Sequence, residues 1–543
     1  MSQFDIIFVL PYLFSDHPSF PEGILKRILE KEGFRVGVIE QPFWQKSSSF
    51  SVLGKPKYFF AVISGPVDST VLNYTSTRKR RYEDLYQLEG DGFFPGYPDS
   101  IKYKIRPDNS VIVFSNKLKE VFKDVPIVIG GVEATLRQFT YYDFQKDKIR
   151  RPILFDSRAS LMVTGPGEKQ LVKIAKLLRD GEKIEDINLN GTSKIVKDIE
   201  DIPEITLIPS YDEILSDKKL LVNAFLKKDR GIKQGNVVCQ KIGDRYIAVF
   251  PNEDYKSSDL DLYYSSPFKR VHLSTKKFTP ALRMNLFSIT SHRGCEGGCS
   301  FCSISLQEGK RIISRSFDSI RKEVESLKAH PEWRGVISDI GGPSAEMFGD
   351  SCSAKICLRT SCIFPGKCSS LERGDNYLKL LRDIRSINGV KKVFLGSGLR
   401  YDNLTDNREL LEDILEFHSG KFLRIAPEHT EKSVLDLMGK PGYLELEKFI
   451  KVYRDISKRI NRKIELSPYL IIGHPGETLE DLIEMKRKLK YLDLKTSDVQ
   501  IFTPTPGTLS TAMYYSETDL SENLIPVEKN IKELIRRKKI IIG

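Results

Sequence analysis

The pattern of apolar and polar positions divides the chain into two regions in which strands and helices alternate. In the first region, short apolar runs are separated by stretches with helical periodicity, such as Glu22–Glu32 and Glu168–Leu178. Short buried strands that alternate with helices are typical of a doubly wound parallel sheet, so we predict an α/β fold. The expected strands are Ile6–Leu10, Arg35–Ile39, Tyr58–Ile63, Val125–Ile129 and Leu161–Val163.

The alternation starts again near residue 281 and continues for six strands. Six strands with helices between them predict a partial (β/α)6 barrel, in which functional side chains lie at the C-terminal ends of the strands. The expected strands are Leu286–Thr290, Gly335–Ile340, Lys392–Leu395, Phe422–Ile425, Ile464–Ile472 and Val499–Thr503. The expected helices are Ser316–His330, Asn376–Ile387, Arg408–His418, Leu444–Ile460 and Thr478–Leu492.

These patterns predict four parts of the chain. Residues 1–205 form the N-terminal sheet domain, and the polar, aromatic stretch 206–280 is interpreted as a connector or cap. The barrel occupies 281–515 and carries a cysteine-rich insert at 343–374, and 516–543 is expected to be a tail that ends in a basic amphipathic helix.

The overall composition is that of a water-soluble protein. Hydrophobic residues make up 40% and charged residues 29% of the 543 positions, and no apolar run approaches the ~20 residues that a membrane-spanning helix needs. Because the start also lacks a basic leader, we expect a cytoplasmic protein with no membrane partner. The net charge of +12 permits RNA as a partner, and the basic runs Arg78–Arg81 and Arg536–Lys539 are either solvated surface or nucleic-acid contacts.

The eight cysteines are unevenly placed. Cys239 stands alone, three cysteines fall within Cys295–Cys302, and four fall within Cys352–Cys368. In a reducing compartment, clusters of this kind indicate metal ligands rather than disulfides.

The three-cysteine cluster has the spacing C-x3-C-x2-C and follows the first strand of the predicted barrel. Thiolates of Cys295, Cys299 and Cys302 could each bind one iron of a [4Fe–4S] cluster, which leaves the fourth iron open to another ligand. Glycines within this loop allow the backbone to wrap closely around such a cluster. A structural zinc site with His292 as the fourth ligand is the alternative.

With Phe301 before its last cysteine, this motif resembles the signature of the radical S-adenosylmethionine (SAM) superfamily. Further segments along nearly the whole chain resemble the YgiQ-type members of that superfamily. These segments are Asp16-His-Pro-Ser-Phe20, Ser338-Asp-Ile-Gly-Gly-Pro-Ser-Ala-Glu-Met347, Ser397-Gly-Leu-Arg-Tyr-Asp402 and Ile425-Ala-Pro-Glu-His-Thr430.

The resemblance implies two cofactors, a [4Fe–4S] cluster and SAM, which chelates the open iron. One-electron reduction, by a donor such as flavodoxin or ferredoxin, then splits SAM into methionine and a 5′-deoxyadenosyl radical that abstracts hydrogen from a substrate. The substrate itself is left unassigned.

The resemblance also implies that SAM is bound by residues at the strand ends. Gly341 and Gly342 match the glycines of a Gly-Gly-Glu segment that binds the amino group, although the glutamate is absent here. Ser397 matches a polar contact to the ribose or carboxylate, Arg400 could pair with the carboxylate, and Glu428 could contact the ribose. Gly473-His-Pro-Gly-Glu477 and Pro504-Thr-Pro-Gly-Thr508 are also similar to segments of this family.

Three further features leave alternatives open. Cys352, Cys357, Cys362 and Cys368 suit either an auxiliary iron–sulfur cluster or a zinc-stapled, thiol-rich loop. The N-terminal domain resembles a cobalamin-binding module at Gly130-Gly131-Val-Glu-Ala-Thr135 and Val163-Thr-Gly-Pro-Gly-Glu168, but His17 is interpreted as a capping or packing residue rather than a cobalt ligand. His429 and His474 are either substrate-facing or structural.

Two other functions compete with a radical SAM enzyme of unknown substrate. A methylthiotransferase-like modifier of RNA or protein is suggested by Ser314-Arg-Ser316 and the basic surface, although no basic β-barrel follows the predicted barrel. A non-catalytic iron–sulfur protein that binds RNA or senses redox state would not need the SAM-binding strand ends.

Overall fold

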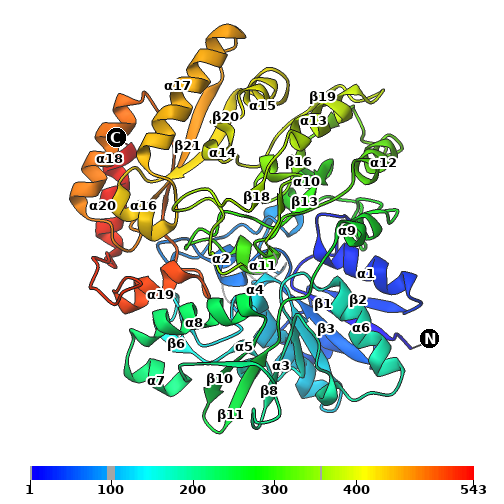
Figure 1. The fold of residues 1–543 in the computed structure, drawn as a ribbon. Helices are drawn as coiled ribbons and strands as arrows, with labels where there is room; N and C mark the ends of the chain where they lie inside the picture. Colours follow the sequence, from blue (N-terminus) through cyan, green and yellow to red (C-terminus); the bar gives the residue numbers. More distant parts are fainter. Residues whose placement is uncertain (1–2, 95–103, 355–356, 543) are drawn as a thin grey trace. The chain divides into compact units, whose positions relative to one another are not determined.

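The computed structural model describes residues 3–94, 104–354 and 357–542, so residues 355 and 356 of the predicted insert lie outside the description (Figure 1). The chain forms two compact units. The first comprises 1–254, 266–286 and 505–507, and the second comprises 255–265, 287–504 and 508–543. None of the described helices is long and apolar enough to cross a membrane.

The first unit is built on a nine-stranded sheet in the order β2-β1-β3-β4-β7-β8-β11-β10-β9. Its strands are β1 (Ile6–Leu10), β2 (Val36–Glu40), β3 (Phe59–Ile63), β4 (Ile127–Gly130), β7 (Leu161–Val163), β8 (Thr192–Val196), β9 (Ile205–Ile208), β10 (Val237–Ile242) and β11 (Arg245–Val249). The pairs from β2 to β7 are all parallel. Every residue of β1 and β3 is buried, as expected for parallel strands covered on both faces. The predicted parallel sheet is therefore present.

Helices connect these strands. Those of the first unit are α1 (Pro21–Lys31), α2 (Ser69–Asn73), α3 (Ser110–Val121), α4 (Val132–Thr135), α5 (Ile153–Ser157), α6 (Glu168–Arg179), α7 (Tyr211–Ser216), α8 (Leu220–Gln234) and α10 (Pro280–Asn285), and a hairpin pairs β5 (Tyr141–Asp143) with β6 (Lys148–Arg150). The helix α6 buries Leu171, Ile174 and Ala175, spaced three and four positions apart, in the same core as β1 and β3.

The predicted connector at 206–280 differs in the structure, because its first part belongs to the sheet. Strand β10 pairs antiparallel with β11 and parallel with β9, and β11 pairs with β8. Polar residues hid this strand from the sequence pattern. Gln240 is fully buried, where its side chain accepts from the backbone N–H of Thr140 (2.8 Å) and donates to the carbonyl of Pro209 (2.7 Å). A buried amide with both groups bonded is compatible with a central strand.

The second unit contains parallel strands in chain order. They are β12 (Ser288–Thr290), β15 (Val336–Ile337), β16 (Asp339–Gly341), β19 (Lys392–Val393), β20 (Phe422–Glu428), β21 (Glu465–Ile472) and β22 (Asp498–Ile501). Parallel pairs join β12 to β16, β15 to β19, β20 to β21, and β21 to β22. A parallel bridge between Leu399 and Ile425 links the third strand to the fourth. Six parallel strands in sequence order agree with the predicted partial barrel, whose second strand is here split into β15 and β16.

Helices and short hairpins complete the second unit. The helices are α9 (Ser257–Tyr264), α11 (Ile304–Glu308), α12 (Phe317–Leu327), α13 (Asn376–Ser386), α14 (Tyr401–Leu404), α15 (Arg408–Asp413), α16 (Lys432–Met438), α17 (Tyr443–Arg459), α18 (Leu479–Tyr491), α19 (Leu509–Ser516) and α20 (Ile531–Ile542). The hairpins pair β13 (His292–Arg293) with β14 (Ile313–Ser314), and β17 (Ser351–Cys352) with β18 (Leu371–Glu372).

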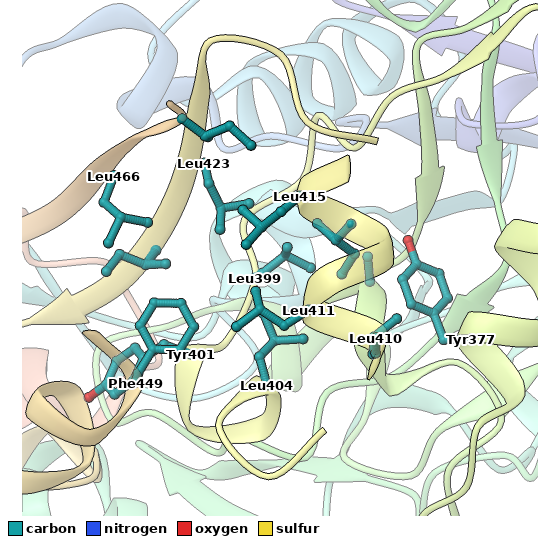
Figure 2. Close-up of a cluster of buried hydrophobic side chains, with 14 of the residues drawn as sticks. Tyr377, Leu399, Tyr401, Leu404, Leu410, Leu411, Leu415, Leu423, Phe449 and Leu466 are labelled. Atoms are coloured by element: carbon teal, nitrogen blue, oxygen red, sulfur yellow. The ribbon is translucent and has the colours of Figure 1, made fainter. Parts of the chain in front are cut away.

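The core of the second unit forms between the strands and these helices. Figure 2 shows leucines of the α14–α15 region meeting Leu423 of β20 and Leu466 of β21, with Tyr401 and Phe449 beside them. Burying a side chain of this size contributes roughly 1.5–3 kcal/mol. The packed core fixes the positions of the strands, and thereby the loops at their C-terminal ends.

The predicted tail at 516–543 also differs, because its last helix is part of this core. Helix α20 packs against α18, β21 and β22, and it buries Leu534 and Ile541. These two residues are seven positions apart and share one face of the helix. The helix is rich in basic residues, of which Arg536 and Lys539 are exposed while Arg537 pairs with Glu477 and Glu528, and this charge made the segment look like a solvated tail in the sequence.

Candidate metal centre at the barrel strand ends

The three cysteines lie in the loop that follows β12 and β13, at the C-terminal end of the first barrel strand. The loop is closed by a turn in which the Cys302 N–H donates to the Cys299 carbonyl (3.1 Å). Gly297 lies before this turn, midway between Cys295 and Cys299. A Cβ atom there would be 3.5 Å from both the Cys295 and Cys299 sulfurs and 2.8 Å from Nη1 of Arg400. A side chain at this position would therefore fill the space between the thiols.

The thiols are strongly desolvated. Burial, together with the neighbouring Cys299 sulfur, raises the pKa of Cys295 to about 11 and that of Cys302 to about 12. Metal ligands must be thiolates, and positive charge is what makes a thiolate favourable in such surroundings. A buried group of thiols of this kind suits a metal rather than free cysteines.

Arg400 provides positive charge beside the thiols. Its Nη1 lies 3.5 Å from the Cys299 sulfur, while its Nη2 donates to Asp402 at 3.0 Å. The Arg400 backbone N–H donates to Glu346 at 3.3 Å, which fixes the start of α14. Both side chains of the Arg400–Asp402 pair are almost completely buried. The pair is thus held against the cysteine loop by its own hydrogen bonds.

Glu428 ends the fourth strand in an unusual conformation. Its φ is +66°, in the left-handed region, and the pairing of β20 with β21 shifts just before it. Its Oε1 lies 3.7 Å from Nζ of Lys440, but its Oε2 is buried with no hydrogen-bond partner in the described chain. Burial raises the pKa of Glu428, and Lys440 and Arg400 oppose that shift. A strained residue with an unsatisfied buried oxygen is a feature of ligand sites.

The other residues predicted for this site, Gly341, Gly342 and Ser397, lie at the ends of the second and third strands. Gly342 lies against His292, where a Cβ would be 2.6 Å from the imidazole Nε2. Ser397 donates from Oγ to Asp339 at 2.5 Å, and Asp339 also accepts from the Gly396 N–H at 2.9 Å. A Cβ on Gly341 would lie 3.9 Å from the Ser397 hydroxyl, so these two strand ends are neighbours.

Several residues of this site were missed by the sequence analysis: Asp339, Glu346, Asp402 and Lys440. Asp402 was quoted within a family-like run, so its place beside Arg400 could have been proposed. Lys440 had no such signal. It follows α16 and donates to the carbonyl of Ala426 (2.6 Å), 14 positions away, a contact that only the fold creates.

The histidines at the strand ends have structural partners. His474 contacts Ser510 Oγ at 2.7 Å, and Ser510 Oγ lies 2.7 Å from Ser300 Oγ, so the end of the fifth strand is tied to the cysteine loop. Burial lowers the pKa of His474 to about 3, which keeps the ring neutral. His429 accepts from the Glu431 N–H at 3.0 Å, and its Nε2 lies 3.5 Å from Glu477.

The zinc alternative relied on His292. Its ring instead lies against Gly342, and its Nδ1 is 3.0 Å from Ser291 Oγ. Within the described residues, no three histidine, cysteine or acidic side chains converge closely enough to share one metal ion. The orientation of His292 does not support a zinc site that uses it.

The segments that suggested RNA binding or a methylthiotransferase are engaged within the chain. Arg315, from Ser314-Arg-Ser316, is buried. Its Nη1 lies 2.5 Å from Oε2 of Glu323, and its guanidinium carbon lies 4.5 Å from the centre of the Tyr264 ring. In the basic runs, the Arg78 guanidinium lies 4.4 Å from the centre of the Phe144 ring, and Arg536 pairs with Glu533 at 2.7 Å. These contacts favour a structural interpretation of the basic residues.

In the first unit, His17 is a packing residue as predicted. Its Nδ1 accepts from the Ser19 N–H at 3.0 Å, and its Nε2 lies 2.8 Å from Nη1 of Arg270. Both ring nitrogens are therefore engaged within the chain. At the other strand ends, Gly131 has a φ of +92° before α4, and Thr164 Oγ1 is buried without a hydrogen-bond partner in the described chain.

Comparison with known proteins agrees with this geometry. The family model described as "Radical SAM N-terminal" matches residues 1–288, and that of the "Radical SAM superfamily" matches residues 289–489. A UPF0313 protein of Clostridium botulinum (strain ATCC 19397 / Type A) is 41% identical over 97% of this chain and 83% of its own length. A UPF0313 protein of Geobacter sulfurreducens is 39% identical over 95% of this chain and 86% of its own length.

A solved structure shares the fold. The radical S-adenosylmethionine methyltransferase TsrM from Kitasatospora setae, determined with cobalamin and a [4Fe–4S] cluster bound, is 16% identical. The structural alignment covers 94% of this chain and 77% of the TsrM chain, with a TM-score of 0.52. A family match over both units and relatives aligned over most of their length show that this chain belongs to the UPF0313 proteins of the radical SAM superfamily, which use a [4Fe–4S] cluster and SAM.

Proposed function

We propose that this protein is a radical SAM enzyme that cleaves SAM reductively at a [4Fe–4S] cluster held by Cys295, Cys299 and Cys302. The cluster and SAM would supply electron transfer into the sulfonium, which yields methionine and a 5′-deoxyadenosyl radical able to take hydrogen from a substrate. A one-electron donor such as flavodoxin or ferredoxin is the expected partner. The chain's own residues then bind and orient the cofactor.

Each strand end has a distinct role in this proposal. Backbone groups of Gly341 and Gly342 bind the amino group of SAM, since a side chain at Gly342 would collide with His292. Ser397 donates to Asp339, so its oxygen is free to accept a hydrogen bond from a hydroxyl. Arg400 has one nitrogen toward the thiols and two toward Asp402, an arrangement that suits a carboxylate approaching the cysteine loop.

The unpaired buried oxygen of Glu428 is the observation that carries the proposal. A buried acceptor without a partner costs about 1–3 kcal/mol, and a ribose hydroxyl would satisfy it. Cys302 is close enough for the Glu428 charge to raise its pKa, so the carboxylate lies near the thiol loop. A hydroxyl-bearing ligand bound beside the thiols, such as the ribose of SAM, would satisfy this oxygen.

The test is SAM turnover by the anaerobically reconstituted full chain. With dithionite and SAM, we expect the parent to produce 5′-deoxyadenosine, measured by chromatography, and a Cys295→Ala/Cys299→Ala/Cys302→Ala variant to produce none. Cys239→Ala is the matched control, because Cys239 is a buried cysteine of β10 in the other unit. Full iron and sulfide loading of the parent without 5′-deoxyadenosine, in the presence and absence of cell extract, would contradict the proposal.

Cobalamin is a second candidate ligand, proposed for the N-terminal unit. The bound cobalamin of TsrM, which has a similar fold, motivates it. A histidine-ligated form does not fit, because both nitrogens of His17 are engaged. Binding without a histidine ligand would use the ends of β4 and β7, where Gly131 has a left-handed φ and the Thr164 hydroxyl has no hydrogen-bond partner in the described chain. Equilibrium dialysis against hydroxocobalamin tests this: we expect one bound per chain, and no binding would exclude it.

A further inference from the structure

The cysteine-rich insert is held in place with almost no hydrophobic core. Between residues 351 and 374, the only described residues that are buried are Ser361, Cys362 and Ile363. Leu358 is 53% exposed. A segment of this length cannot be ordered by apolar burial alone, and small modules of this kind usually require a disulfide or a metal. None of its four cysteines forms a disulfide in the described chain.

The four thiols occupy key positions in this segment. Cys352 pairs with Leu371 in the β17–β18 hairpin that closes its base. Cys368 donates its N–H to the Cys362 carbonyl (2.8 Å), which brings the last two cysteines to one turn. The Leu371 N–H in turn donates to the Cys368 carbonyl (3.2 Å), so Cys352, Cys362 and Cys368 lie on backbone segments that are hydrogen-bonded to one another or paired.

A cation is directed at one of these sulfurs. Nζ of Lys310 lies 3.2 Å from the Cys357 sulfur and 2.5 Å from the carbonyl of Arg359. The Arg359 guanidinium in turn donates to the carbonyls of Ser361 (3.0 Å) and Gly366 (2.6 Å). A lysine ammonium against sulfur stabilises thiolate, the form that binds metals. The backbone around the thiols is thus arranged by charged side chains.

The insert is also fastened to the predicted cluster loop. The Cys362 N–H donates to the carbonyl of Glu296, the residue after Cys295, at 3.0 Å. On the other side of the loop, a Cβ on Gly298 would lie 2.2 Å from the Thr360 carbonyl oxygen. The backbone of the insert therefore packs directly on the loop that carries Cys295 and Cys299.

We infer that Cys352, Cys357, Cys362 and Cys368 bind a second iron–sulfur cluster. Four thiolates from one loop match the four-cysteine ligation of such clusters. Iron–sulfur ligation is favoured over zinc by the position of the insert, since its backbone hydrogen-bonds directly to the loop expected to hold the first cluster. By cross-linking the four cysteines, the second cluster would stabilise an insert that has almost no apolar core.

The experiment is a metal count on full-length protein purified without oxygen. Iron, zinc and acid-labile sulfide are measured per chain for the parent, for Cys295→Ala/Cys299→Ala/Cys302→Ala and for Cys352→Ala/Cys357→Ala/Cys362→Ala/Cys368→Ala. We expect on the order of eight irons in the parent and about four in each variant. Cys239→Ala should retain the full amount.

The triple variant decides the inference even if the quadruple variant fails to fold, because its insert is intact. Loss of all iron from the triple variant would overturn the inference and leave the proposed function untouched. One zinc with no iron in the triple variant would also overturn it, in favour of a zinc staple. About four irons and four sulfides retained by the triple variant, without 5′-deoxyadenosine production, would support both the second cluster and the proposed function.

Discussion

Both units bury charged side chains at the ends of their parallel strands, but the carboxylates of the two units differ in how many of their oxygens accept hydrogen bonds. In the first unit, Asp68 accepts from two backbone N–H groups on one oxygen and from Arg137 on the other. Both oxygens of Glu133 accept as well, from Ser110 Oγ and the Val111 N–H at 3.0 Å each. In the second unit, one oxygen of Asp402 and one of Glu428 are buried with no hydrogen-bond partner in the described chain.

This difference distinguishes carboxylates that only stabilise the fold from carboxylates that can bind a ligand. A carboxylate with both oxygens hydrogen-bonded within the chain stabilises the loops around it and has no unbonded oxygen for a ligand. One with an unsatisfied buried oxygen costs stability, and folded chains tolerate that cost mainly at functional sites. Strand-end position in the sequence does not distinguish the two cases. The predictions below test whether each group behaves as this comparison requires.

The largest expected effect is structural. Arg137→Met leaves Asp68 buried without its cation, and we expect the first unit to lose about 3–5 kcal/mol of stability. Arg151→Met is the control, because Arg151 is half-exposed in its pair with Asp156 and should cost no more than about 1 kcal/mol. Denaturant-dependent hydrogen exchange of β3 and β4 measures both. If the two variants lost the same amount of stability, the buried Arg137–Asp68 pair would be no more important to the fold than the half-exposed Arg151–Asp156 pair.

The second effect is a pH dependence from Glu22. Burial raises the pKa of Glu22 from its ordinary 4.5 to about 7, although Tyr12 and the Ser15 N–H donate to its oxygens. Because the folded state then holds a proton that the unfolded state has released, stability falls as pH rises from about 4.5 to 7. The total is roughly 3 kcal/mol. Glu22→Gln should flatten this part of the stability profile of the first unit, measured by denaturant titration at several pH values. A slope unchanged by the substitution would refute the assignment.

The third effect is functional and falls in the second unit. Glu428→Gln should cost less stability than Arg137→Met, because glutamine keeps an oxygen that can face Lys440 and Lys440 also donates to the Ala426 carbonyl. We expect it to lower the rate of SAM cleavage by roughly tenfold to a hundredfold, because the ribose hydroxyl loses a charged acceptor. Glu431→Gln, three residues further along, is the matched control and should retain activity. A stability loss for Glu428→Gln as large as that of Arg137→Met would make Glu428 a structural residue.

The smallest effect concerns the support of the cysteine loop. Ser510→Ala breaks the contacts that join His474 to Ser300, and we expect about 1 kcal/mol of local destabilisation. The visible result should be faster loss of iron to a chelator. Ser326→Ala, which removes only a local contact to the Glu323 carbonyl, should not change that rate. Equal rates in the two variants would show that the contacts do not hold the loop.

Most of the fold could be predicted from hydrophobic periodicity, because it depends on local alternation. β1 and β7 begin and end where expected, and the six barrel strands lie in the expected order. Strands β9 to β11 were missed because buried polar groups such as Gln240 mimic a loop until their partners are known. Helix α20 was missed because a basic helix with a narrow apolar face resembles a tail.

The candidate site divides in a similar way. Its cysteines are close in sequence and were predicted by spacing alone, whereas Lys440 reaches Glu428 only through the turn that follows α16. The unpaired state of Glu428 Oε2 was equally invisible in the sequence, since it depends on which side chains fail to reach it. Short-range motifs therefore predicted the metal ligands, and the fold was needed for the charges around them.

The packing of α20 has an evolutionary consequence. Gly473, at the end of the fifth strand, has a φ of +72°, and a Cβ on it would lie 2.4 Å from Cδ2 of Leu534. This glycine belongs to a motif that resembles a cofactor-binding stretch, yet its backbone conformation and a leucine 61 positions later both favour glycine here. A smaller residue in place of Leu534 would make room for a Cβ, but the left-handed φ would still disfavour any other residue. Gly473 is therefore expected to remain glycine among homologues even in lineages that have altered Leu534.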